Sequence, residues 1–360
     1  MMSDSFLHSR AFAPALGRID NQVARLLKAA TDGRGPSKGE CAFLLEFSET
    51  SLEAACLRAV ADTVTRRRFG NTGLIFGQIG IETAPCPGAC KFCSFAAGHT
   101  AFGSSVMSEQ DLVRSVEGFT ASGELDALFL MTMHTSDFER LLHTLVFVRK
   151  RIPQETQLVV NIGDFDADQA RDLKAAGVTG AYHVLRLREG RDTALDPERR
   201  KTTIRTIKES GLDWWFCCEP IGPEHSPQEL AEQMYLGIEY GCVGHAAMRR
   251  VYLPGSPLAA HGQISELRLA QVTAVVALAT LACPQARAIG VHEPNLLGLT
   301  AGANSLFAEA GANPRDTQED TAGHRGRDIG DCKRMLYEAG FESLGTVSGR
   351  RACLSDAYRL

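Results

Sequence analysis

Eight short apolar runs alternate with helix-like segments along this 360-residue chain, and this alternation limits the fold more than any other feature. The runs occupy residues 73–82, 125–132, 156–163, 179–187, 212–220, 243–253, 286–291 and 302–309. Runs of this length indicate buried strands, and strands that alternate with helices predict parallel βαβ units. We therefore expect an α/β fold, a (β/α)8 TIM-type barrel, with an open doubly wound sheet as the alternative.

The segments between the runs carry recognisable helix starts. Ser108 begins one helical pattern, and Asp196 and Ser226 each precede a proline at the first helical position of another. Residues 20–69 are mostly helical in pattern and predict an N-terminal helical extension before the first strand. The polar, glycine-rich stretch at 310–330 predicts a loop or arm.

Charge and hydropathy exclude several classes of protein. The net charge is −5 with a pI near 6.1, which argues against nucleic-acid binding because that usually needs a basic face. The one basic cluster, residues 66–68, is expected to be a solvent-exposed helix face. The apolar stretch 270–283 is too short to span a bilayer and predicts a buried helix. We expect a cytoplasmic protein with no membrane partner, whose eleven cysteines are mostly reduced.

Three of those cysteines, Cys86, Cys90 and Cys93, fall within eight positions directly after the first strand. Loops that follow the strands of a parallel barrel form its active-site face. A structural zinc site normally needs four protein ligands, and no second CxxC is present. Three thiolates can instead bind three irons of a 4Fe–4S cluster and leave the fourth iron open. An incomplete zinc site or three unrelated cysteines is the alternative.

Polar residues gather where the other predicted strands end. They are Thr132, His134, Asn161, Asp164, Glu219, Tyr252, His292, Glu293 and Asn295. Because strand ends meet at one face of a barrel, they predict a polar rim that suits a small polar substrate. We select His134, Asn161, His292 and Glu293 as substrate-site candidates, although a histidine after a strand is more often a hydrogen-bonded turn residue.

The spacing CxxxCxxC, with the aromatic Phe92 before the last cysteine, resembles the radical S-adenosylmethionine superfamily. The resemblance implies two cofactors, a 4Fe–4S cluster held by Cys86, Cys90 and Cys93, and S-adenosylmethionine bound at its open iron. It also implies reductive cleavage of S-adenosylmethionine to a 5′-deoxyadenosyl radical that removes a substrate hydrogen. Phe92 is implied to place its backbone beside the adenine.

Two longer stretches extend the resemblance to a subgroup. Residues 63–95 are similar to the region that enters the barrel in biotin synthase, a maturase of FeFe-hydrogenase and methylornithine synthase. Residues 299–314 resemble the domain shared by biotin and thiamine synthesis enzymes. The implied organisation is an N-terminal helical extension (1–70), a radical core (71–255), a barrel-completing region (256–345) and a tail (346–360).

The resemblance also suggests which residues bind the cofactor. Arg200 matches an arginine that holds the carboxylate of S-adenosylmethionine, a role for which the planar guanidinium fork is suited. A shift of one residue would give that role to Arg199, and an exposed helix position is the other interpretation. The further cofactor-binding candidates are Arg186, Arg188, Glu189 and Glu219.

The implied function is radical chemistry on a small polar metabolite or cofactor precursor, with an electron donor such as flavodoxin or ferredoxin as partner. Sulfur insertion of the biotin synthase type is the alternative, but it needs a second cluster with cysteines on the second, third and fifth strands. Here only Cys217 and Cys218 lie on such a strand, and neighbouring strand residues face opposite ways. A non-catalytic iron–sulfur or zinc protein is the alternative of another class.

Overall fold

The computed structural model describes residues 19–346, 349 and 351–355, so the expected 1–70 extension and 346–360 tail lie partly outside the described residues. The strands are β1 (Thr72–Gly80), β2 (Glu82–Thr83), β3 (Ser105–Val106), β4 (Ala127–Met131), β5 (Gln157–Asn161), β6 (Gly180–Tyr182), β7 (Asp213–Ile221), β8 (Gly244–Arg249), β9 (Ala288–His292), β10 (Ser305–Gly311), β11 (Ser343–Gly345) and β12 (Arg351–Cys353). The helices are α2 (Asn21–Thr31), α3 (Lys38–Glu46), α4 (Leu52–Phe69), α5 (Glu109–Thr120), α6 (Phe138–Arg149), α7 (Ala167–Ala175), α8 (Pro197–Glu209), α9 (Pro227–Glu239), α10 (Glu266–Ala279), α11 (Leu296–Leu299) and α12 (Ile329–Glu338), with short 3₁₀ turns at Ala259–His261, Thr280–Ala282 and Thr321–Gly323.

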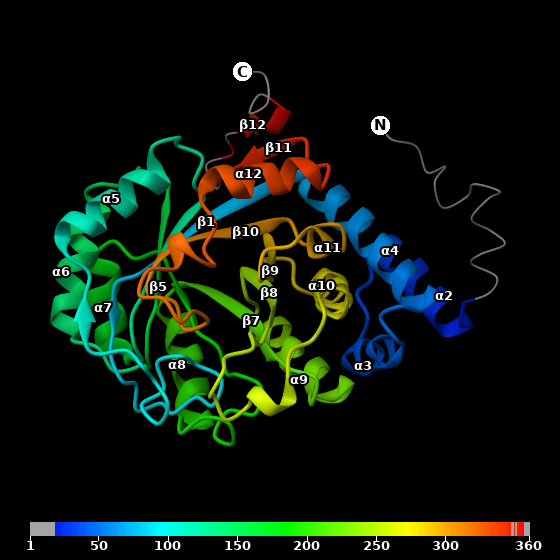
Figure 1. Cartoon of the computed structure of the whole chain (residues 1–360). Coiled ribbons are helices and arrows are strands. Elements are labelled where there is room, and N and C mark those ends of the chain that lie inside the picture. The colour runs from blue at the N-terminus through cyan, green and yellow to red at the C-terminus, as the bar shows by residue number, and fades with distance from the viewer. Residues whose placement is uncertain (1–18, 347–348, 350, 356–360) are drawn as a thin grey trace.

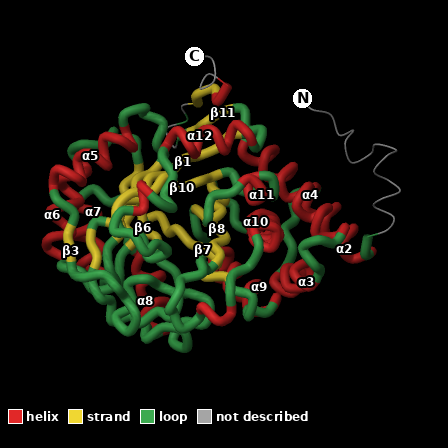
Figure 2. Tube along the Cα trace, viewed as in Figure 1, coloured by secondary structure: helices red, strands yellow, loops and turns green. Residues whose placement is uncertain are grey.

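Eight parallel strands close into a barrel, as the alternating pattern predicts (Figures 1 and 2). The strand order is β1, β4, β5, β6, β7, β8, β9 and β10, and β10 pairs back with β1 over seven residues, from Leu74 opposite Ser305 to Gly80 opposite Gly311. The short strands β11 and β12 extend the sheet beside the start of β1. The (β/α)8 prediction is confirmed, and the alternative of an open sheet is wrong.

A layer of aromatic rings fills the lower part of the barrel. Phe76, Phe129, Trp215 and Phe307 come from four strands, and the ring centroids in contact lie 5.0–5.9 Å apart. All four side chains are buried, and tilted or edge-to-face contacts of this kind are favourable beyond the area they bury. Because side chains alternate along a strand, the next inward-facing residues lie one layer higher, above this aromatic floor.

Helices α2, α3 and α4 lie on one side of the barrel (Figure 1), where α3 packs against α9 and α10, α4 packs against α10, and α2 packs on α4. Arg68 at the end of α4 donates to the carbonyl oxygens of Thr280 (3.0 Å), Cys283 (3.1 Å) and Ala286 (2.6 Å). Arg66 bonds Asp62 and the carbonyl of Ala339. The expectation that the basic cluster is a solvated face is therefore wrong for these two arginines, because their guanidinium groups satisfy carbonyls at the base of the barrel.

The fourth predicted strand, 179–187, is much shorter than its apolar pattern suggested, since β6 ends at Tyr182. Side chains from neighbouring elements bind the carbonyls that follow. Trp214 Nε1 donates to His183 O at 2.8 Å, Arg200 donates to Val184 O, and Gln233 donates to Leu185 O. These carbonyls are satisfied without a strand partner, so the chain turns away into the loop that carries Arg186 to Glu189.

The long apolar stretch after β8 forms α10, whose residues from Leu269 to Ala279 are all buried. The expectation of a buried helix here is confirmed, although the helix begins at Glu266 and ends before residue 283. Within the described part of the chain, the structure has no helix of sufficient length and hydropathy to cross a membrane.

The aromatic floor yields a first prediction. Phe129→Ala should lower the free energy of unfolding by about 3–5 kcal/mol, because it removes buried ring contacts and leaves a cavity. Urea unfolding monitored by circular dichroism measures the change. Val146→Ala, at an exposed position on α6, is the control and should change stability by less than about 0.5 kcal/mol. Equal effects of the two substitutions would contradict the structural role of the floor.

Candidate active site

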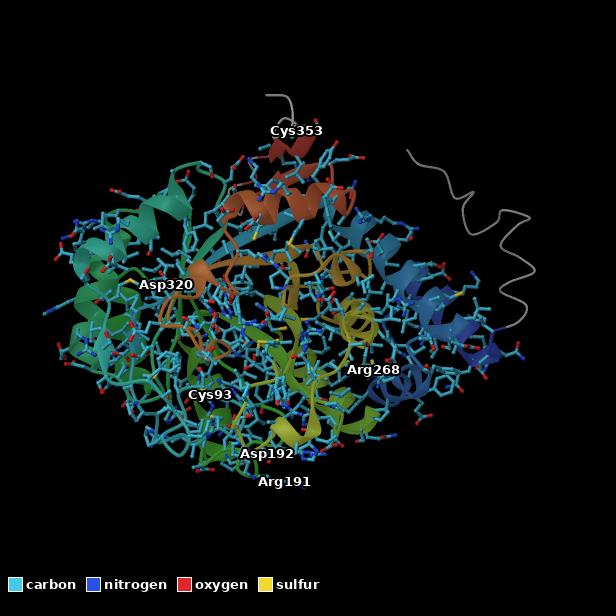
Figure 3. The ribbon with its side chains drawn as sticks, in the orientation of Figure 1. Cys93, Arg191, Asp192, Arg268, Asp320 and Cys353 are labelled. Carbon is cyan, nitrogen blue, oxygen red and sulfur yellow. The ribbon has the colours of Figure 1, made fainter. Side chains whose placement is uncertain are left out.

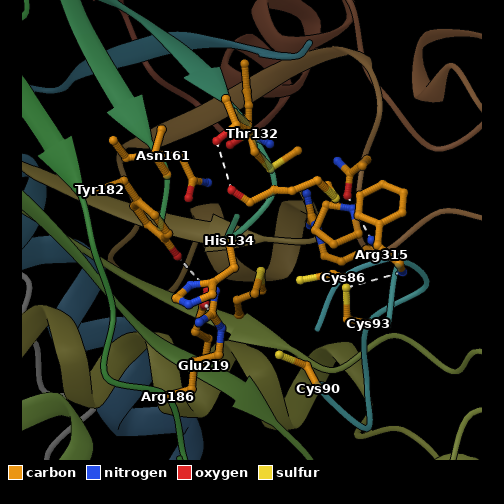
Figure 4. Close-up of a pocket in the computed structure, with 18 of the residues that line it drawn as sticks. Cys86, Cys90, Cys93, Thr132, His134, Asn161, Tyr182, Arg186, Glu219 and Arg315 are labelled. Atoms are coloured by element: carbon orange, nitrogen blue, oxygen red, sulfur yellow. Dashed lines mark hydrogen bonds and ion pairs between the residues drawn. The ribbon is translucent and has the colours of Figure 1, made fainter. Parts of the chain in front are cut away.

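A cavity of about 950 Å³, including the part open to solvent, lies above the aromatic floor at the carboxyl ends of the strands. One side of it is formed by Cys86, Cys90 and Cys93, with Asn161 and Tyr182 across from them (Figure 4). The floor beneath includes Phe307. The carboxyl ends of barrel strands are where this fold positions reacting groups.

The loop that carries the three cysteines runs between β2 and β3 and is held by backbone hydrogen bonds. Cys86 N–H donates to Phe95 O at 2.7 Å, and Ser94 N–H donates to Pro314 O at 3.0 Å. Lys91 N–H donates to Asp192 O at 2.9 Å, which ties the loop to the segment after β6; Figure 3 labels Cys93 and Asp192. The loop is therefore positioned by two other strand-end segments.

All three thiols are free and partly buried. Burial raises the pKa of Cys90 to about 11 and that of Cys93 to about 12, so these thiols hold their protons at neutral pH until a metal displaces them. Among the described residues, no three His, Cys, Asp or Glu side chains are grouped tightly enough to bind one metal ion. Three thiols around one wall fit a cluster better than a single ion, because each thiolate then binds its own iron.

Arg200 is almost fully buried, with 3% of its side chain exposed. Its Nη1 lies 3.2 Å from Asp164 Oδ1, and its Nη2 donates to Val184 O at 2.9 Å. Burial alone would raise the pKa of Asp164, but His183 and Arg200 beside it lower that pKa well below its usual range. The guanidinium thus lines the cavity in a defined orientation, with its charge offset by a buried carboxylate.

A second ion pair lies across the cavity mouth. Arg186 Nε is 3.3 Å from Glu219 Oε1, and the Tyr182 hydroxyl donates to Glu219 Oε2 at 2.5 Å. Burial works against the charge of Arg186, yet Glu189 and Glu219 raise its pKa above the usual value. Glu219 is therefore a buried carboxylate that two side chains orient toward the cavity.

The structure brings most of the residues selected from the sequence to one place. Those lining the cavity are Cys86, Cys90, Cys93, His134, Asn161, Arg186, Arg200, Glu219 and His292. Four others do not line it: Phe92, Arg188, Glu189 and Glu293. Arg199, the alternative to Arg200, has 72% of its side chain exposed.

The four residues outside the lining have specific partners or positions. Arg188 Nε donates to Glu229 Oε1 at 2.7 Å at the start of α9, which turns it away from the cavity. The buried Glu189 side chain accepts a hydrogen bond from Arg186 N–H at 2.9 Å. Glu293 binds Arg315 and Arg325. Phe92 is partly buried, and its proposed contact involves its backbone only.

The rim predicted from strand ends divides in a similar way. Thr132 lines the cavity, and Asp164 lies behind Arg200. Tyr252 is 52% exposed, and Asn295 caps α11 by accepting from Gly298 N–H at 2.8 Å.

Five polar residues that line the cavity were not selected from the sequence: Gln78, Tyr182, Glu309, Asn313 and Arg315. Gln78 and Glu309 are polar residues inside otherwise apolar strands, and that interruption was a usable signal. Arg315 lies in the loop after β10, where no local pattern distinguishes it from other charged loop residues.

The two adjacent cysteines of β7 face opposite ways, as strand geometry predicts. Cys217 lies between the inward-facing Trp215 and Glu219 and interacts with Tyr182, whereas the Cys218 thiol approaches Leu230 O of α9 at 3.9 Å. Neither thiol lines the cavity. At most one of them is on the side where a second cluster would have to bind.

Sequence comparisons find biotin synthases among the relatives. The enzyme of Magnetococcus marinus is 25% identical over 333 residues, covering 88% of this chain and 98% of its own. That of Desulforudis audaxviator is 25% identical over 300 residues, covering 79% and 89%. No family model matches the chain.

Two solved structures have the same fold. The FeFe-hydrogenase maturase of Carboxydothermus hydrogenoformans superimposes with a TM-score of 0.72 at 16% identity, covering 94% of this chain and 84% of its own. Methylornithine synthase superimposes with a TM-score of 0.73 at 16% identity, covering 93% and 99%.

The buried His292 generates a prediction about pH. Burial, with Arg315 nearby, lowers its pKa to about 3, while an unfolded histidine titrates near about 6.5. Only the unfolded state gains this proton between those values, so the histidine contributes stability above pH 6.5 that is lost as the pH falls toward 3.

Replacing His292 by Phe should therefore reduce the pH dependence of the unfolding free energy by up to about 1.4 kcal/mol per pH unit below pH 6.5. The phenyl ring keeps the packing on Phe307, whose centroid lies 4.7 Å away. Urea unfolding of the reconstituted protein between pH 7.5 and 5.5 measures the slope. His143→Phe, at an exposed position on α6, is the control, and an unchanged slope in His292→Phe would contradict the prediction.

Proposed function

We propose that this chain is a radical S-adenosylmethionine enzyme of the subgroup that includes biotin synthase, the FeFe-hydrogenase maturase and methylornithine synthase, and that it performs radical chemistry on a small polar metabolite or cofactor precursor enclosed in the barrel. The observation that carries the proposal is one cavity with three thiols on one wall and polar strand ends on the other. A reactive group formed at the wall of the cavity that carries Cys86, Cys90 and Cys93 would face a substrate bound at the opposite wall.

We assign the cluster to Cys86, Cys90 and Cys93 and the bound S-adenosylmethionine to the cavity beside them. Together these groups would supply an organic radical after transfer of one electron from a donor such as flavodoxin or ferredoxin. The chain's own residues provide binding and orientation. Arg200 offers its fork to a carboxylate, Glu219 accepts hydrogen bonds from a hydroxyl or amine, and the aromatic floor excludes water from below.

Sulfur insertion of the biotin synthase type is the second candidate, since the sequence relatives are named biotin synthases. It receives less support from the cavity, because Met131 of β4 and Asn161 of β5 occupy the inward positions nearest the strand ends, and neither is a cysteine. Of the two cysteines on β7, only Cys217 faces inward. A single thiolate would therefore have to hold a second cluster whose usual ligation is four cysteines.

The cysteine assignment leads to the experiment that tests the proposal. Anaerobic reconstitution should give about four irons per chain and an electron-spin signal that changes when S-adenosylmethionine is added, because the cluster has one iron without a protein ligand. Alanine at Cys86, Cys90 or Cys93 should abolish the cluster. Cys283→Ala, at a buried position away from the cavity, should retain it.

Two results would count against this assignment. Stoichiometric zinc in place of iron would return the triplet to a structural role. Iron and sulfide that persist in the triple alanine variant, and that are lost on adding Cys217→Ala, would instead establish a second cluster and favour sulfur insertion.

The geometry of Arg200 generates the next prediction. Arg200→Lys keeps a positive charge but loses the planar fork, so S-adenosylmethionine binding should weaken by about 1–3 kcal/mol. Equilibrium dialysis with the reconstituted protein measures this. Arg199→Lys, on the exposed neighbour, is the matched control, and equal affinities in the two variants would remove Arg200 from the cofactor site.

A further inference from the structure

Four charged residues at the mouth of the barrel form a chain of ion pairs that the proposed function has not used. Arg315 Nη1 lies 2.8 Å from Glu293 Oε1, its Nη2 bonds Glu309, and Arg325 bonds the other oxygen of Glu293. We refer to Arg315, Glu309, Glu293 and Arg325 as the Arg315 quartet. It contains two guanidinium groups and two carboxylates, so its formal charge is zero.

Two members of the quartet face the cavity directly. Glu309 and Arg315 both line it, with 6% and 11% of their side chains exposed. Glu309 lies within β10, two residues before its last residue and one inward position above Phe307 of the floor. Gln78 Nε2, on the neighbouring strand, lies 3.4 Å from its Oε1. Burial raises the pKa of Glu309 despite the arginine beside it.

The loop that carries Arg315 is held firmly. Arg315 N–H donates to Asn313 Oδ1 at 3.0 Å, and the fully buried Asp316 accepts from Thr321 Oγ1 at 2.9 Å and from Gln318 N–H at 3.1 Å. The same loop accepts a hydrogen bond from Ser94, the residue directly after Cys93. Arg315 is therefore positioned relative to the cysteine wall by backbone contacts.

A charged ligand disturbs such a quartet unless its own charges balance. A substrate anion that takes Arg315 displaces Glu309, which is then a buried carboxylate without a partner. A substrate cation that pairs with Glu309 removes one of the two carboxylates that compensate the charge of the buried Arg315. A ligand with both charges replaces the internal pair and leaves every charge compensated.

We propose that the substrate is a zwitterion of the α-amino-acid type, with its carboxylate on Arg315 and its ammonium group on Glu309. The two side chains bond each other directly, so the two ligand charges must also lie close together, as they do on a single α-carbon. Glu293, itself held by Arg325, keeps one side of Arg315 in place while the other side changes partner. This inference rests on the proposed function and identifies the substrate class of the same cavity.

The test uses the full-length, anaerobically reconstituted protein saturated with S-adenosylmethionine. Each of the twenty common L-amino acids is added separately, and the shift in the melting temperature of the protein is measured. The affinity of each amino acid that raises the melting temperature is then measured by equilibrium dialysis. The decarboxylated amine and the deaminated acid of each binder serve as matched ligands. We expect at least one amino acid to bind, at least tenfold more tightly than either counterpart.

Matched variants then separate the two contacts. Arg315→Gln should weaken amino-acid binding at least tenfold but leave the affinity of the amine counterpart unchanged, and Glu309→Gln should weaken amino-acid binding while leaving that of the acid unchanged. The exposed Arg334→Gln on α12 and Glu117→Gln on α5 are the controls and should bind as the unmodified protein does.

The inference is overturned if no amino acid binds, if the amine or the acid binds as tightly, or if the quartet variants behave like the controls. Iron content and dithionite-driven cleavage of S-adenosylmethionine, both measured without any amino acid, report separately on the proposed function. A protein that cleaves S-adenosylmethionine but binds no amino acid contradicts the substrate class alone. A protein without a cluster contradicts the proposed function and the inference together.

Discussion

The pairing of the last barrel strand with the first is the contact on which the rest of the site depends. At its upper end, β1 and β10 approach so closely that a Cβ on Gly80 would lie 1.7 Å from Ala312 O, and one on Gly311 would lie 2.3 Å from Gly80 O. Gly311 also has a φ of +70°, which favours glycine. This closure brings the cysteine loop after β1 beside the Arg315 loop after β10, although more than 200 residues separate them in the sequence.

Inside the closed barrel, one layer of side chains is apolar and the layer above it is charged. The lower layer consists of packed aromatic rings, whereas the layer above contains carboxylates and guanidinium groups. Each buried charge there has a partner from a different element, such as Asp164 with Arg200 or Glu309 with Arg315. Removing one member of such a pair leaves the other uncompensated, which costs more than the pair contributes as a whole.

A site residue could be predicted only where a pattern of neighbouring residues in the sequence identifies it. The cysteines were found because their spacing is local, and Glu219 and Asn161 because they are polar residues near the ends of apolar strands. Arg188 has the same apparent position as Arg186, but its φ of +55° turns it toward Glu229, a residue on the helix after the next strand. Glu309 was missed although it interrupts an apolar strand in the same way, and Arg315 was missed because only the folded loop brings it over the cavity.

The sequence by itself determined the order and type of the elements, the α/β class and the thiol triplet, because apolar periodicity, helix caps and ligand spacing are properties of neighbouring residues. Only the tertiary structure decided which charges meet. Arg200 with Asp164, Arg186 with Glu219, and Arg315 with Glu309 and Glu293 are pairs formed across elements. Closure of the barrel and burial of the cavity determine which charged residues pair with each other. Neither of these is encoded in a local sequence pattern.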